Sequence, residues 1–147
     1  MRAILTAGLI AGTLDILDAF IFYGFRGVSP VRILQSIAAG LLGRASFQGG
    51  AKTALLGAAL HYLIAFTATI LFFLISRRLP FARQHAIISG LLYGAGVYAF
   101  MNLIVLLLSK AGQPAFFGWP FVNGVLAVVL LVGLPISLIC KAFSGIR

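Results

Sequence analysis

The stretch TALLGAALHYLIAFTATILFFLIS, residues 53–76, contains no Asp, Glu, Lys or Arg. It is longer than the roughly 20 apolar residues that an α-helix needs to cross about 30 Å of hydrocarbon. Residues 86–109 and 111–140 are equally free of charged side chains, and residues 3–23 are interrupted only by two aspartates. The predicted transmembrane spans are residues 3–23, 53–76, 86–109 and 120–140.

The composition excludes several other classes of protein. Apolar residues make up 62% of the chain and charged residues only 9%, far from the balance of a soluble domain. The apolar runs do not alternate with polar residues, which argues against a transmembrane β-barrel. The single cysteine, Cys140, excludes a disulfide framework. We therefore predict an all-α integral membrane four-helix bundle that forms one domain over residues 1–147.

The net charge of +9 does not indicate nucleic-acid binding, because the basic residues are spread singly between the apolar runs. We expect them to mark span ends and to contact anionic lipids of the bilayer. With four spans, six basic residues fall on the side of the termini, namely Arg2, Arg77, Arg78, Arg83, Lys141 and Arg147. Five fall on the other side, namely Arg26, Arg32, Arg44, Lys52 and Lys110. This small excess predicts that both termini are cytoplasmic.

A short helix is predicted at residues 30–42, between the first two spans. Ser29 is a typical helix cap, and Pro30 suits the first helical turn. The helix has one apolar face, and Arg32 and Gln35 lie on its polar face. One interpretation is an interfacial helix at the membrane surface; the other is a re-entrant element that covers a polar pocket.

Both acidic residues of the chain, Asp15 and Asp18, lie inside the first span. An ionised Asp near the centre of a membrane helix costs about 2.5–3.5 kcal/mol, so a partner, a proton or water is expected there. Gly8 and Gly12 form a GxxxG stripe on the side of Asp15, which favours close approach of a second helix. The two carboxylates are therefore expected to point into the bundle.

Counting helical rise from the span ends places several polar side chains in the same half of the membrane, on the side of the long first loop. We call them the polar cluster: Asp15, Asp18, His61, Asn102 and Asn123. In a structural interpretation, Asp15, His61 and Asn102 hydrogen-bond one another and fix the helix register. In a functional interpretation, Asp15 and His61 form a proton or substrate site, since a histidine beside a carboxylate titrates in the physiological range.

A third interpretation of the polar cluster pairs Asp18 with Arg32 or Arg44 from the first loop, the remaining basic residues facing lipid phosphates. Catalytic signatures such as HExxH and GxSxG are missing from the sequence. The two histidines, His61 and His85, are predicted on opposite sides of the membrane, so a shared metal is not expected. We predict no catalytic residue, no metal and no cofactor.

The leading functional hypothesis is a non-enzymatic accessory or assembly component, with a membrane-protein partner or a homo-oligomer. The alternative is a small transporter or proton-coupled permease that uses Asp15, Asp18 and His61. A third hypothesis is a membrane enzyme acting on lipid or quinone, which requires a pocket open to lipid beside His61.

Four segments resemble a group of small bacterial membrane proteins with four predicted spans. They are AGTLD at residues 11–15, RGVSPVRILQSIA at residues 26–38, GLLG at residues 40–43 and the stretch around His61. The resemblance implies a location in the bacterial inner membrane. It carries neither a reaction nor a catalytic residue to this chain.

Overall fold

The computed structural model of the protein describes residues 1–112 and 116–144, and all regular structure within them is helical. Four helical segments are long and apolar enough to cross a membrane. They are α1 (Arg2–Gly24); α3 (Gly50–Arg78); α5 (Ala86–Phe100) with η2 (Met101–Val105) and α6 (Leu106–Leu108); and α7 (Trp119–Ala127) with η3 (Val128–Gly133) and α8 (Leu134–Ala142). The prediction of an all-α chain with four long apolar helices is confirmed.

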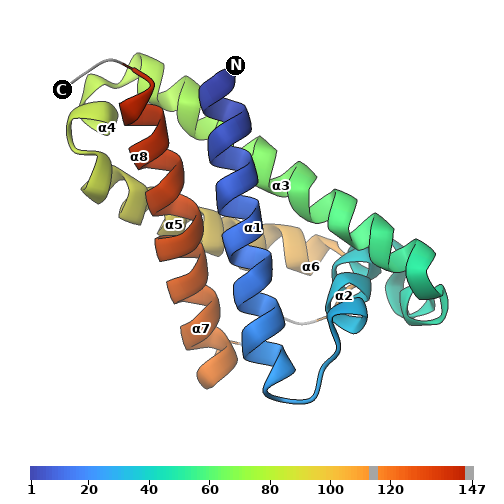
Figure 1. Ribbon diagram of the computed structural model, residues 1–147. Helices are drawn as coiled ribbons and strands as arrows, with labels where there is room; N and C mark the ends of the chain where they lie inside the picture. The colour runs from blue at the N-terminus through green and yellow to red at the C-terminus, as the bar shows by residue number, and fades with distance from the viewer. Residues whose placement is uncertain (113–115, 145–147) are drawn as a thin grey trace.

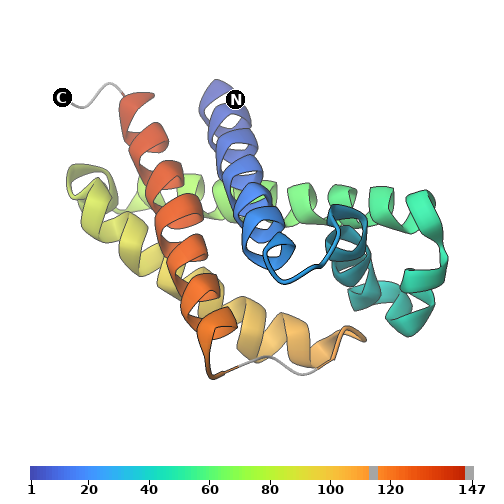
Figure 2. The same cartoon turned by 60° about the horizontal axis from the view of Figure 1, so that its bottom comes forward.

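The long segments form two layers (Figures 1 and 2). α1 and the α7–η3–α8 segment lie next to each other, and α3 and α5–α6 cross behind them. The short α4 (Pro80–Gln84) joins α3 to α5, and these two helices diverge from it (Figure 2). The start of α1 and the end of α8 lie at the same end of the molecule as α4 (Figure 1).

The end of the molecule near α4 is packed with small and apolar side chains. Phe72 is only 2% exposed there, and Ile136 is fully buried. The complete buried cluster comprises Ala7, Ala11, Ala68, Phe72, Ala82, Val132, Ile136 and Cys140. This half of the bundle therefore holds the helices together, while the opposite half is less tightly filled.

Glycines allow the helices of the two layers to approach closely. A Cβ atom on Gly133 would overlap the backbone of Gly90 and Gly94, so η3 and α5 touch through bare backbone. A Cβ atom on Gly8 would overlap the ring of Phe66 on α3. The GxxxG stripe of the first span is therefore a helix contact, as small residues commonly are between membrane helices.

A helix, α2 (Pro30–Leu42), lies between the first two long segments and packs along α3. The Ser29 hydroxyl accepts a hydrogen bond from the Arg32 N–H at 3.3 Å, as expected for its capping position. The α2 backbone passes so close to α3 that a Cβ atom on Gly57 would overlap the Leu34 carbonyl. α2 is thus part of the bundle wall rather than a detached loop.

The polar face expected for α2 is partly wrong, because Gln35 is buried and only 5% exposed. Its side-chain Nε2 donates to the Gly50 carbonyl at 3.1 Å, at the start of α3. The Gln35 backbone carbonyl accepts from the Ser46 hydroxyl at 2.6 Å. Ser46 lies in the 3₁₀ helix η1 (Gly43–Gln48), and its contact with α2 could not be predicted from helix periodicity.

Candidate functional site

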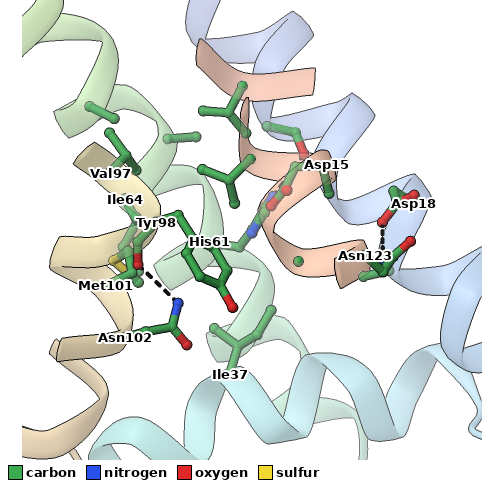
Figure 3. A pocket seen from close by; sticks show the side chains of 18 of the residues that line it. Asp15, Asp18, Ile37, His61, Ile64, Val97, Tyr98, Met101, Asn102 and Asn123 are labelled. Atoms are coloured by element: carbon green, nitrogen blue, oxygen red, sulfur yellow. Dashed lines mark hydrogen bonds between the residues drawn. The ribbon is translucent and has the colours of Figure 1, made fainter. Parts of the chain in front are cut away.

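The looser half of the bundle encloses a cavity of about 270 Å³, which we call the polar cavity (Figure 3). Its walls come from α1, α2, α3, from α5 with η2, and from α7 with η3. All members of the polar cluster line it: Asp15, Asp18, His61, Asn102 and Asn123. Residues far apart in sequence thus meet in one place.

Asp18 has a defined partner in the polar cavity. The Asn123 side-chain Nδ2 donates to the Asp18 Oδ2 at 2.7 Å, linking α7 to α1 (Figure 3). The predicted pairing of Asp18 with Arg32 or Arg44 is not found in the described part of the chain. Both arginines are exposed, and the Arg32 guanidinium stacks over the ring of Phe47 at 4.4 Å instead. α2 turns Arg32 outward because its other face is occupied by α3, and Arg44 lies beyond α2, in the 3₁₀ helix η1.

His61 is held in one orientation by the backbone of α1. Its Nε2 lies 2.7 Å from the Gly12 carbonyl oxygen. Because a carbonyl oxygen only accepts, Nε2 must carry the hydrogen. The neutral ring therefore keeps Nδ1 as its acceptor. Beside it, the hydroxyls of Tyr62 and Thr13 are hydrogen-bonded at 2.9 Å and join the same two helices.

Asp15 faces the polar cavity and accepts no hydrogen bond from residues 1–112 or 116–144. The side chains of His61 and Asp18 line the same cavity. The predicted hydrogen-bond network of Asp15, His61 and Asn102 is therefore wrong in its connections. His61 bonds to Gly12, and the Asn102 Nδ2 donates to the carbonyl of Tyr98 at 2.9 Å. Asp15 therefore lies near His61 and Asp18 without a direct hydrogen-bond donor among the described residues.

Two π-helical segments border the polar cavity. η2 contributes Met101 and Asn102, and η3 contributes Val128 and Val132. π-helical turns are rare and occur frequently at functional sites. η3 ends shortly before Pro135, which has no N–H to donate to the carbonyl four residues earlier. The wider turns change the direction of side chains at the cavity wall.

Sequence reasoning missed several cavity residues. Tyr98 lines the cavity and supplies the carbonyl that Asn102 binds. Its position four residues before Asn102 is a signal that could have found it, since such residues share a helix face. Tyr23 and Ile37 also line the cavity. Because Ile37 lines the polar cavity, α2 covers part of it. Nothing in the local sequence of α2 indicates this contact.

The described residues contain no group of three or more His, Cys, Asp or Glu side chains able to hold a metal ion. His85 lies at the junction of α4 and α5 and does not line the polar cavity. The centroid of its ring is 4.6 Å from that of the Phe81 ring. Cys140 is buried in the packed half. The titratable side chains that line the polar cavity are thus its carboxylates, its histidine and its tyrosines.

No protein-family model, curated protein or solved structure matches the chain.

Proposed function

We propose that this protein is a small transporter or proton-coupled permease of the bacterial inner membrane. The observation that carries the proposal is the Asp15 carboxylate, which faces the polar cavity beside His61 without a hydrogen bond from the described residues. An ionised carboxylate within a membrane span is expensive unless it is paired or hydrated. Because Asp15 has no fixed hydrogen-bond donor among the described residues, its carboxylate can bind an exchangeable partner, either a proton or a cation.

The chemistry follows from the two neighbouring groups. Asp15 holds either a proton or a positively charged group of a solute, because either one neutralises its carboxylate. His61 keeps its Nε2 hydrogen on the Gly12 carbonyl, which leaves Nδ1 as the acceptor nitrogen of the ring. Asp18 stays bonded to Asn123 and adds negative charge without exchanging its partner. Proton occupancy and solute binding are coupled through Asp15.

The proposed orientation places both termini in the cytoplasm. Arg77, Arg78 and Arg83 lie in or beside α4, at the end where α1 starts and α8 ends. Such density of Arg in a short loop favours the cytoplasmic side. Of the basic residues expected at this end, Arg147 lies outside the described residues. The polar cavity then lies in the periplasmic half, and α2 is a re-entrant element covering it through Ile37.

Proton flux into liposomes tests the proposal. The purified full chain is reconstituted with an internal pH-sensitive dye, and a potassium gradient with valinomycin drives protons inward. Wild-type protein is expected to acidify the lumen faster than protein-free liposomes. Asp15→Asn removes this flux, whereas His85→Gln, at the far end of the fold, retains it. Flux that is equal in wild type and Asp15→Asn contradicts the proposal.

A second function, a non-enzymatic accessory or assembly component, is favoured by the exposure of the third long segment. In its most apolar window only 6% of residues are buried, compared with 33% in the last long segment. A face of this kind suits a membrane-protein partner or a second copy of the chain as well as lipid. Purification from native membranes tests this function. Reproducible co-purification or an oligomer supports it, and a monodisperse monomer without a partner contradicts it.

A further inference from the structure

An apolar groove between α3 and the α5–η2 segment adjoins the polar cavity. This groove, which we call the lateral groove, has a volume of about 510 Å³. The residues that line both spaces are Ile64, Ala68, Val97 and Met101. The two spaces therefore adjoin along one wall, polar on one side and apolar on the other.

The lateral groove offers little to a polar ligand. Its two hydroxyl groups are already used, since Thr67 donates to the Leu63 carbonyl at 2.7 Å and Tyr93 donates to the Ala68 carbonyl at 2.6 Å. Leucine, isoleucine, valine, phenylalanine and methionine make up most of the remaining lining. A surface of this kind fits an aliphatic chain and offers a polar group no free hydroxyl partner.

The charges of the residues that line the polar cavity indicate which head group an aliphatic ligand would carry there. Asp15 and Asp18 line the polar cavity, and no Lys or Arg does. Asp18 already has Asn123 as a donor, whereas Asp15 lacks one among the described residues. A cationic head group complements this arrangement, and an anionic one is repelled by it.

We infer that the ligand of this site is a cationic amphiphile, an ammonium head group at Asp15 with an aliphatic chain in the lateral groove. The inference rests on the proposed function and adds the substrate class to it. The ligand enters sideways from the bilayer between α3 and α5, where the two helices diverge (Figure 2). Its ammonium group and the proton compete for the same carboxylate.

Gly96 allows the groove to be filled without disturbing the fold. It lines the lateral groove, and a Cβ atom placed on it meets no atom within 4 Å. Gly96→Phe therefore occupies the space of the aliphatic chain. Gly24, near the end of α1, has equally open surroundings and lines neither space, so Gly24→Phe is the matched control. Far-UV circular dichroism verifies that both variants keep the wild-type helix content.

The experiment measures equilibrium binding of two radiolabelled probes to the full chain in phosphatidylcholine nanodiscs, corrected for binding to empty nanodiscs. Dodecyltrimethylammonium carries head and chain, and tetramethylammonium carries the head alone. We expect Asp15→Asn to weaken both probes, and Gly96→Phe to weaken the long probe about tenfold or more, because its ring fills the space of the aliphatic chain. Gly96→Phe leaves tetramethylammonium unchanged, and Gly24→Phe leaves both probes unchanged.

The outcomes separate the inference from the proposed function. Equal affinity of wild type and Gly96→Phe for the long probe overturns the lateral groove as the chain site, even when Asp15→Asn still abolishes proton flux. If dodecanol competes for the site as well as dodecyltrimethylammonium does, the requirement for a cationic head group is overturned. The groove is then a site for lipid tails. Proton flux that is equal in wild type and Asp15→Asn, with both probes binding as expected, overturns the proposed function instead.

Discussion

The His61 ring on α3 donates its Nε2–H to the Gly12 carbonyl on α1 at 2.7 Å. This bond joins the two helices at the border of the polar cavity, and it turns Nδ1 into the free nitrogen of the ring. Gly12 has no side chain to block the approach, since a Cβ atom there would already lie 3.0 Å from the Tyr62 ring. One contact therefore sets both the helix spacing and the chemistry of His61.

Replacing His61 with Leu is expected to destabilise the protein by about 0.6–1.7 kcal/mol, the range measured for hydrogen bonds between membrane helices. The loss arises because the α1–α3 bond disappears. The free energy of unfolding in mixed micelles of increasing SDS content measures it. Thr67→Ala is the control, since the exposed Thr67 hydroxyl bonds only within its own helix. Equal stability of wild type and His61→Leu contradicts the structural role of the bond.

The Asp18–Asn123 pair predicts a rescue by exchange. Asn123→Asp replaces the 2.7 Å hydrogen bond with two facing carboxylates and is expected to destabilise the protein by about 1–3 kcal/mol. The double variant Asp18→Asn with Asn123→Asp restores an amide opposite a carboxylate and recovers most of the stability. Unfolding of all three proteins under the same conditions measures the coupling. A double variant no more stable than Asn123→Asp argues against the pair.

The sequence predicts the four long helices because their composition is decisive over more than twenty residues each. It also predicts which polar residues share a membrane half, since depth follows from helical rise, and all five line one cavity. The sequence does not predict which of these side chains hydrogen-bond to one another. Asp18 bonds to Asn123, more than a hundred positions away, and nothing local distinguishes this amide from Arg32 as a partner. Pairing depends on how helices rotate, which periodicity does not fix.

Gln35 illustrates a second limit of sequence reasoning. A polar side chain on an amphipathic helix is normally assigned to the exposed face. Here it is buried because carbonyl and hydroxyl groups of Gly50 and Thr53 meet it at the start of α3. The π-helical segments were also unforeseen, since Asn102 and Val128 carry no local mark of a wider turn. These features arise from tertiary contacts.

Gln35→Leu is expected to loosen η1 while leaving the long helices intact. The substitution removes the Gln35 side-chain bonds to the Gly50 carbonyl and the Thr53 hydroxyl, which join α2 to the start of α3 directly after η1. Hydrogen–deuterium exchange of a peptide covering residues 43–50 measures the effect, with faster exchange expected in the variant. A peptide from α8 serves as the internal reference. Unchanged exchange in residues 43–50 shows that Gln35 does not organise this segment.

Gly133→Leu is expected to destabilise the protein by about 1–3 kcal/mol or more, because the added side chain must displace the α5 backbone at Gly90 and Gly94. Gly96→Leu, on the same α5 but with open space around it, is the matched control and keeps wild-type stability. Thermal unfolding in detergent, followed by circular dichroism, compares the two. If Gly133→Leu unfolds at the wild-type temperature, α5 and η3 do not touch through bare backbone. The contrast between two glycine substitutions thus separates helix contact from the general effect of a larger apolar side chain.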